Sequence, residues 1–294
     1  GPKKARQHEI FHGRLGQRIA RRDHLQRRVP ATRVAVSDFT PLFLTSARAV
    51  IAALLGAALL IVLRQSRPAK NDLLSLAIVA AGVVVGFPLL TALALKYVTA
   101  AHSVVFVGLL PLATAIFGVL RGGERPKPLF WLFSGVGSAT VVGFALANGG
   151  EASMVGDLLM VSAIILCGLG YAEGAKLSRK LGGWQVISWA LILSLPLMGV
   201  IALATLPGTW QGIDGHAWLG LAYVSVFSML VGFVFWYRGL ALGGIAGVGQ
   251  LQLLQPFHCL LLAGTLLGEP VSPTMIVATV AVVLCVAGAR RFAR

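Results

Sequence analysis

The sequence LLSLAIVAAGVVVGFPLLTALAL, residues 73–95, runs for 23 residues without a charged side chain. A helix of about 20 mostly apolar residues is long enough to cross the hydrocarbon core of a bilayer. Over all 294 residues, 57% are hydrophobic and only 12% are charged, whereas about 25% are charged in a typical soluble domain. This composition excludes water-soluble, disordered and fibrous proteins and indicates an integral membrane protein.

Similar apolar runs recur along the whole chain, separated by short connectors that contain Gly, Pro and charged residues. They predict nine membrane helices, over residues 40–63, 73–95, 102–120, 129–148, 155–175, 184–206, 216–237, 245–267 and 272–289. Since the connectors are too short to hold a soluble domain, the sequence predicts a helical bundle with little protein outside the membrane.

Basic residues are concentrated in alternate connectors. One set of connectors, together with the C-terminal segment, carries twelve Lys and Arg residues, and the opposite set carries Arg33 and Lys96. Cytoplasmic loops of membrane proteins are enriched in Lys and Arg, so we expect the first set in the cytoplasm. Residues 1–28 hold nine more Lys and Arg and are expected there too. Nine crossings cannot leave both termini in the cytoplasm, so the chain should cross once more before residue 40.

An internal repeat also requires a tenth helix. Pro111 and Glu124 are thirteen residues apart, as are Pro256 and Glu269, and each Glu follows a Gly. The offset of 145 residues between the two pairs aligns five helices with five. An odd number of helices per unit inverts the second unit, as in many secondary transporters. We therefore expect an all-α membrane protein of ten transmembrane helices, built as two inverted five-helix repeats, 29–148 and 149–294, around a central cavity.

The first of these ten helices is not evident in the basic N-terminal segment, residues 1–28. The repeat places it at residues 10–30, which contain six Arg residues, and each Arg costs about 2.5–3.5 kcal/mol at the centre of a membrane helix. Three interpretations stay open: an amphipathic surface helix, a loosely ordered tail, or residues that differ from the natural ones through a reading-frame error. Gly1-Pro2 resembles the remnant of a cleaved purification tag.

Several stretches of the chain resemble the EamA branch of the drug/metabolite transporter superfamily. They are DFTPLFLTSAR at 38–48, Pro111 with GERP at 123–126, Pro256 with GEP at 268–270, and FWYRGLAL at 235–242. The resemblance covers residues 29–294 and is greatest to YddG-type bacterial amino-acid exporters. It implies a multi-pass protein of the bacterial inner membrane with ten helices, two inverted repeats, cytoplasmic termini and a central substrate cavity.

Four polar residues, Gln250, Gln252, Gln255 and His258, lie in the predicted helix 245–267. Polar side chains are costly inside a membrane and therefore indicate function. Because their counterparts at the repeat offset are all apolar, we interpret the four as substrate-binding residues. Amide and imidazole groups hydrogen-bond ammonium, carboxylate or amide groups. Hydrogen bonding between helices is the alternative role, and for His258 alone it is the favoured one.

Four further residues complete the predicted substrate-binding set. Phe87 stands before Pro88, whose ring frees backbone carbonyls in mid-helix, and is either a cavity wall or part of a kink at a tight helix crossing near Gly82. Tyr171 and Trp189 are candidate stacking partners for a substrate. His102 starts the predicted helix 102–120, as the mouth of the cavity or as a helix cap.

Other polar and aromatic residues have two interpretations each. Glu173 is a possible proton-coupling carboxylate, but an ion pair with Lys176 at i,i+3 is favoured. Arg48 either extends toward the outer surface or pairs with a substrate carboxylate. Trp236 and Tyr237, close to a helix end, are interpreted as an aromatic belt at the membrane interface.

The expected function is a secondary transporter that exports small zwitterionic metabolites, above all amino acids, by alternating access. Transport of phosphorylated metabolites or nucleotide sugars is the alternative, but it requires several cavity-facing Lys or Arg residues. An intramembrane enzyme is a distant alternative because a second acid, a metal cluster or a nucleophile with a base is missing. We expect no catalytic residue, cofactor, metal or nucleic-acid partner. The expected partners are a small-molecule substrate and the lipid bilayer, with the protein a monomer or a homodimer.

Overall fold

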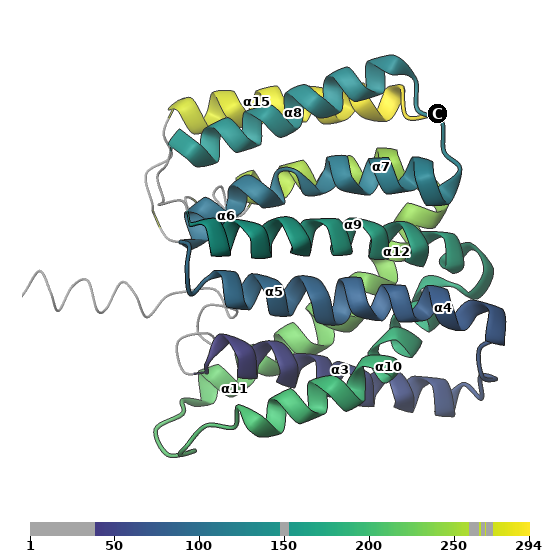
Figure 1. The fold of residues 1–294 in the computed structure, drawn as a ribbon, viewed down its shortest axis with the longest axis vertical. Coiled ribbons are helices and arrows are strands. Elements are labelled where there is room, and N and C mark those ends of the chain that lie inside the picture. The colour runs from purple at the N-terminus through teal and green to yellow at the C-terminus, as the bar shows by residue number, and fades with distance from the viewer. Residues whose placement is uncertain (1–38, 148–152, 259–264, 266–267, 269–272) are drawn as a thin grey trace, which may run out of the picture.

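The structure, a computed structural model, describes residues 39–147, 153–258, 265, 268 and 273–294. Within these residues the chain forms helices and connectors without β-strands, and eight helical segments are long and apolar enough to cross a membrane. Figure 1 shows these segments as a stack of rods that run back and forth between the same two ends of the molecule.

The membrane-length segments include both single helices and helices in several parts. In chain order the elements are α3 (Pro41–Val62), α4 (Lys70–Val79), the π-helix η1 (Ala80–Gly86), α5 (Phe87–Ala94), α6 (Ala100–Val107), α7 (Leu110–Gly122), α8 (Pro128–Ala147), α9 (Met154–Leu181), α10 (Gly183–Ala204), α11 (Gly215–Tyr223), the π-helix η2 (Val224–Val231), α12 (Gly232–Gly243), α13 (Ile245–Gly249), the 3₁₀-helix η3 (Gln250–Leu254) and α15 (Pro273–Arg291). The segments α4–η1–α5, α6–α7 and α11–η2–α12 each form one span.

Eight of the nine helices predicted from the sequence are confirmed as membrane-length segments. The remaining one, 245–267, begins as α13 and η3, and the rest of it lies mostly outside the described residues. The N-terminal segment 1–28 and the expected first helix at 10–30 also lie outside the described residues.

Local sequence signals set the helix ends. Thr40 caps α3 by accepting a hydrogen bond from the backbone N–H of Phe43 (3.3 Å), and Pro41 occupies the first turn, where its missing N–H costs nothing. Ser153 caps α9 in the same way. The C-terminal end of α7 is set by Gly123, whose φ of 67° favours glycine.

The long helix α9 lies in the middle of the bundle and packs against α4, η1, α5, α7, α10 and α12. Two helix pairs lie at opposite edges of the bundle: α3 with α10 at one edge, and α8 with α15 at the other (Figure 1). At Gly82 in η1, a Cβ atom would lie 2.3 Å from the carbonyl oxygen of Leu166 in α9. The close helix approach predicted at Gly82 is therefore confirmed, and only glycine permits it.

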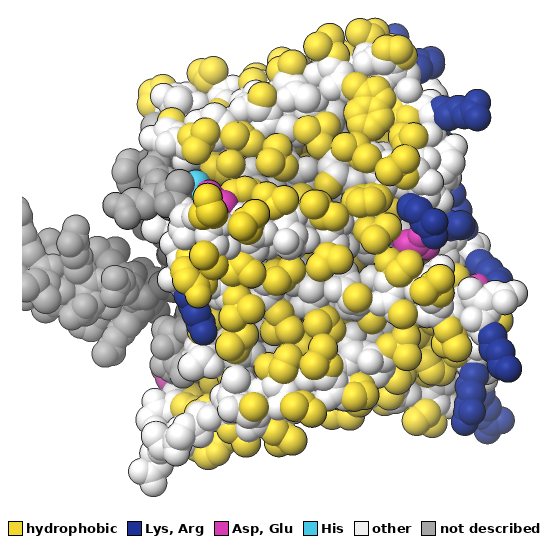
Figure 2. Space-filling view, in the orientation of Figure 1, with side chains coloured by type: hydrophobic (Ala, Val, Ile, Leu, Met, Phe, Trp, Pro, Cys, Tyr) yellow, Lys and Arg dark blue, Asp and Glu magenta, His cyan; other side chains and the backbone are white. Residues whose placement is uncertain are grey.

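Charge and apolar surface are separated along the bundle. Figure 2 shows Lys and Arg side chains gathered at one end and a broad apolar surface over the flanks. The connectors 63–69 and 123–127 and the final residues 292–294 all lie at the basic end. There the backbone N–H of Lys127 donates to the carbonyl of Phe292 (3.0 Å). Exposed Leu, Ile and Val side chains are common on the flanks of the helices, as expected for a surface in contact with lipid.

Helix bounds in the two halves correspond when 145 residues are added. The bounds of η1, 80–86, become 225–231, against 224–231 for η2. Those of α8, 128–147, become 273–292, against 273–291 for α15. The two π-helical segments therefore stand at equivalent positions of the proposed repeat.

Candidate substrate-binding site

A pocket of about 380 Å³ opens between α9, α12 and the segment that begins with η3. The residues that line it are Tyr171, Trp236, Leu251, Gln252, Leu254, Gln255 and His258. Tyr171 lies ten residues before the end of α9, which at 1.5 Å per residue is about 15 Å from the basic end. The pocket therefore lies well inside the membrane-spanning part of the bundle.

One wall of the pocket is aromatic. The rings of Tyr171 and Trp236 meet edge to face with their centroids 5.6 Å apart. The indole Nε1 of Trp236 is buried and has no hydrogen-bond partner within the described part of the chain. An N–H group in this position usually finds a partner, so it is available to a bound solute.

The opposite wall carries neutral polar groups. Gln252 is 9% exposed and its Nε2 donates to the carbonyl of Gly249 at 3.1 Å. Gln255 and His258 are exposed. In a 3₁₀-helix, residues three apart lie above one another, which explains why η3 places Gln252 and Gln255 on the same face. Among the described residues, no Lys, Arg, Asp or Glu lines this pocket.

Four predicted substrate-binding residues lie elsewhere. Gln250 is fully buried, and its amide atoms have no partner within the described residues. Because it precedes Gln252 by two residues, η3 turns it away from the pocket. Phe87 packs in an apolar cluster with Met160, and Trp189 packs against the largest core cluster. The structure thus brings together Tyr171, Gln252, Gln255 and His258, but not the complete predicted set.

His102 is the fourth predicted residue outside the pocket. It lies at the start of α6, where Thr99 caps the helix, and its Nε2 is 2.8 Å from Oδ1 of Asp157 in α9. His102 is only 6% exposed. It therefore joins α6 to α9 at the end of the bundle opposite the basic one.

The interpretation of Trp236 and Tyr237 as an interfacial belt is wrong. Trp236 lines the pocket, and Tyr237 is fully buried, with its hydroxyl donating to the carbonyl of Gly170 at 3.1 Å. Their position near a helix end was the misleading signal, because it says nothing about which face of α12 carries each ring.

The favoured ion pair between Glu173 and Lys176 is also wrong. The Glu173 carboxylate is fully buried and accepts hydrogen bonds from Nε of Arg121 in α7 and from Oγ of Ser75 in α4 (3.2 Å for Ser75). Lys176 is exposed. Since a residue on α9 can reach its neighbours on other helices, the i,i+3 spacing did not decide the partner.

Comparison with known proteins addresses the kind of protein that carries this pocket. The model of the EamA-like transporter family matches the chain twice, over residues 29–146 and 154–290. This chain belongs to the EamA-like transporter family.

Relatives of this EamA protein bear transporter names. It is 65% identical over 266 residues to the "Uncharacterized transporter YdeK" of Bacillus subtilis, covering 90% of this chain and 93% of that protein. It is 25% identical to the "Uncharacterized transporter sll0355" of Synechocystis, covering 82% of this chain and 79% of that protein. A crystal structure with 19% identity shares the fold, with a TM-score of 0.73 over 89% of this chain and 98% of that chain. The EamA protein is therefore a multi-pass membrane transporter of small molecules.

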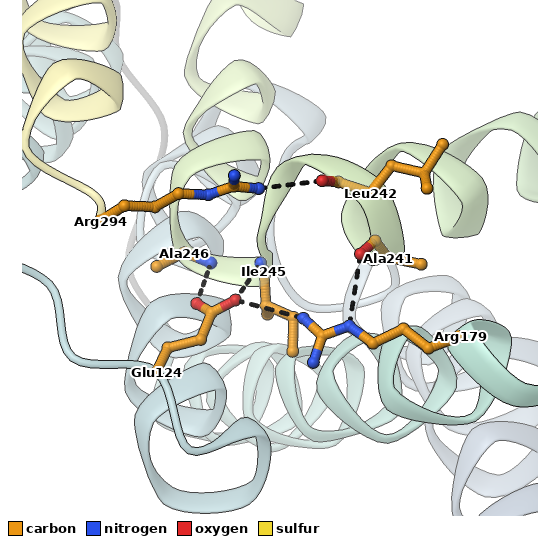
Figure 3. A network of polar contacts seen from close by, with 7 residues as sticks. All are labelled: Glu124, Arg179, Ala241, Leu242, Ile245, Ala246 and Arg294. Atoms are coloured by element: carbon orange, nitrogen blue, oxygen red, sulfur yellow. Dashed lines mark hydrogen bonds and ion pairs between the residues drawn. The ribbon is translucent and has the colours of Figure 1, made fainter.

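The Gly-Glu motif of the first EamA match has a structural role that sequence reasoning did not find. The Glu124 carboxylate accepts hydrogen bonds from the backbone N–H groups of Ile245 (2.5 Å) and Ala246 (2.8 Å), so it caps the start of α13 (Figure 3). Arg179 approaches the same carboxylate at 3.7 Å. The motif thus joins the connector before α8 to α13. Glu269, its counterpart in the second match, lies outside the described residues.

The chemistry available in the site is neutral hydrogen bonding and aromatic contact. The part of the chain that the structure describes contains no group of three or more His, Cys, Asp or Glu residues placed to hold a metal ion. The pocket can therefore bind a solute through amide, imidazole, hydroxyl and indole groups.

Proposed function

We propose that this EamA protein exports small zwitterionic solutes, above all amino acids, through the pocket between α9, α12 and η3. The observation that carries the proposal is the lining of this pocket, in which neutral polar groups face an aromatic wall. The bare charges of a zwitterion can be held by neutral dipoles, and no fixed charge is needed to balance them.

The proposed recognition divides the solute between the two walls. The amides of Gln252 and Gln255 both donate and accept hydrogen bonds, so they suit a carboxylate and an ammonium together. The faces of Tyr171 and Trp236 suit an ammonium group or an apolar side chain. Gln250, Phe87 and Trp189 act, on this proposal, as supports around the pocket and not as direct contacts, whereas His102 joins α6 to α9 at the other end of the bundle.

The alternative substrates, phosphorylated metabolites and nucleotide sugars, suit this pocket poorly. Phosphate is usually clamped by Arg or Lys through charge-assisted hydrogen bonds. The Arg residues of the described chain that gather around a common cavity do so at the basic end, not in the pocket.

The proposed mechanism is alternating access by two inverted five-helix repeats. The matching bounds of η1 and η2 and of α8 and α15 support such repeats. The basic end seen in Figure 2 supports a cytoplasmic location for that end. The proposal places the protein in the inner membrane of a bacterium, with both termini in the cytoplasm. The proposed transporter is a monomer or a homodimer, and the proposal does not include nucleic-acid binding.

Glu173 is the proposed coupling residue. Its carboxylate joins α4 and α7 to α9 through Ser75 and Arg121, so loss of these bonds would weaken a contact between the proposed repeats.

The proposal is tested with purified protein in liposomes and a panel of labelled amino acids and one phosphorylated sugar. We expect amino-acid transport, with a raised KM in Gln252→Leu and Gln255→Leu. Gln185→Leu is the matched control, because Gln185 hydrogen-bonds Gln65 at the exposed basic end (3.1 Å). Transport of the sugar alone, or unchanged kinetics in both pocket variants, contradicts the proposal.

A further inference from the structure

A second cavity, with a volume of about 260 Å³, lies at the basic end of the bundle and apart from the substrate pocket. Its charged lining consists of Glu124, Arg125, Arg179 and Arg294, and the rest of its wall is formed by Gly243, Gly244, Gly247 and Ala293. Three guanidinium groups against one carboxylate leave two net positive charges in the lining. A concentration of positive charge in a concave site attracts an anion.

The carboxylate of Glu124 offsets one of the three positive charges of the lining, and its oxygens are already engaged by donors of the protein itself. Figure 3 shows both oxygens directed at the backbone N–H groups of Ile245 and Ala246, with Arg179 beside one of them at 3.7 Å. The backbone of Gly244, whose φ is 95°, lies close to both the carboxylate and Arg294. A Cβ atom added at Gly244 would lie 3.5 Å from Oε1 of Glu124 and 3.8 Å from Nε of Arg294.

Two of the arginines are held in place by the end of α12. Nε of Arg179 donates to the carbonyl of Ala241 (3.3 Å), and Nη2 of Arg294 donates to the carbonyl of Leu242 (2.9 Å), as drawn in Figure 3. A guanidinium has five N–H donors, so each keeps donors for a ligand. Arg125 is exposed and makes no hydrogen bond or ion pair within the described part of the chain.

The chemistry of this cavity selects a phosphate group. Guanidinium forks match the oxygens of phosphate, which accept paired hydrogen bonds. A volume of about 260 Å³ is below the usual range of about 300–1,000 Å³ for pockets that enclose drug-sized ligands. The cavity therefore suits a single phosphate group better than a whole phosphorylated metabolite.

The surroundings place this cavity within reach of lipid headgroups. Leu242, whose carbonyl holds Arg294, is an apolar residue at the end of α12 and is 70% exposed. The cavity thus lies where the apolar flank meets the basic end, and basic pockets at this level of a membrane protein bind anionic headgroups.

We propose that Arg125, Arg179 and Arg294 form a binding site for a phosphate group, supplied by an anionic phospholipid or by a soluble phosphate. A bound phosphate would bridge the α7–α8 connector, the end of α9 and the segment after α15, whose Arg294 is held by the end of α12. Occupancy stabilises the basic end of the bundle in its present arrangement.

The test measures thermal unfolding of the full chain in a neutral detergent, titrated separately with short-chain phosphatidylglycerol, short-chain phosphatidylcholine and inorganic phosphate. Wild-type protein should be stabilised by phosphatidylglycerol more than by phosphatidylcholine. Arg125→Gln should weaken the apparent affinity about tenfold or more, the loss expected for one charge-assisted hydrogen bond. Arg67→Gln, an exposed arginine outside the cavity lining, is the matched control and should bind like the wild type.

Each outcome of this test has a defined meaning. Stabilisation by phosphatidylglycerol alone identifies a lipid site, and equal stabilisation by inorganic phosphate, also lost in Arg125→Gln, identifies a soluble phosphate. No stabilisation by either ligand, or the same weakening in Arg67→Gln as in Arg125→Gln, overturns the proposal. Because Arg125 has no partner in the described chain, its replacement should leave folding unchanged, and Arg125→Lys should retain part of the affinity.

Discussion

Replacing Glu124 by Ala should destabilise the bundle through the start of α13. The substitution removes the acceptor for two backbone N–H groups, at 2.5 and 2.8 Å. Loss of a helix cap costs about 0.5–2 kcal/mol, and loss of a negative charge at a helix start costs about 0.3–1 kcal/mol. The Glu124 side chain is 16% exposed and its partner Arg179 is 43% exposed, so their ion pair adds little. The expected loss is about 2 kcal/mol.

This loss can be measured as a shift of the unfolding temperature in detergent. An unfolding entropy of about 2.1 cal/mol/K per residue makes about 2 kcal/mol correspond to roughly 3 °C in a chain of 294 residues. Glu124→Gln keeps an amide oxygen as acceptor and should lie between Ala and the wild type. Thr40→Ala, which removes one uncharged cap bond of 3.3 Å at α3, should shift the temperature less than Glu124→Ala. If Glu124→Ala unfolds at the wild-type temperature, the carboxylate does not cap α13.

Three further predictions test the packing around α9. Arg121→Gln leaves the buried Glu173 carboxylate without its cation and should lower the free energy of unfolding, measured with denaturant, by about 3 kcal/mol. Adding Glu173→Gln should recover most of this loss. If it does not, the ion pair is not the cause of the loss. Gly174→Ala places a Cβ 2.1 Å from Cε1 of Tyr237 and should lower stability by about 1–3 kcal/mol, whereas Gly199→Ala, with nothing within 4 Å, should be neutral or stabilising. Tyr237→Phe removes the hydrogen bond to Gly170 and should lower the free energy of unfolding by about 1 kcal/mol. Transport should persist, because Tyr237 does not line the pocket. Loss of transport at unchanged stability would contradict this assignment.

The membrane-length helices could be predicted because their signal is local. An uncharged run of sufficient length must form a helix in lipid, where every backbone polar group needs a partner inside the segment. The π-helical form of η1 and η2 could not be predicted, because it depends on packing partners such as Leu166 of α9, which contacts Gly82 and Gly86.

The candidate site was predictable only in part. Of the polar residues concentrated at 250–258, Gln252, Gln255 and His258 line the pocket, but the 3₁₀ geometry of η3 separates Gln250 from Gln252. Trp236 was missed because residue type and depth do not indicate which face of a helix is turned inward. Arg121 precedes Glu173 by 52 residues, so no local spacing could have identified this partner.

The most direct measurement of the central claim is thiol labelling at position 255. In a protein with Cys167, Cys259 and Cys285 replaced by Ala, a cysteine at Gln255 should react with a membrane-impermeant maleimide, and a transported amino acid should slow the reaction. A cysteine at Arg67, an exposed residue of the connector 63–69 at the basic end, should react at the same rate with and without the amino acid. Equal labelling rates at position 255 with and without every transported solute would contradict a substrate site in this pocket.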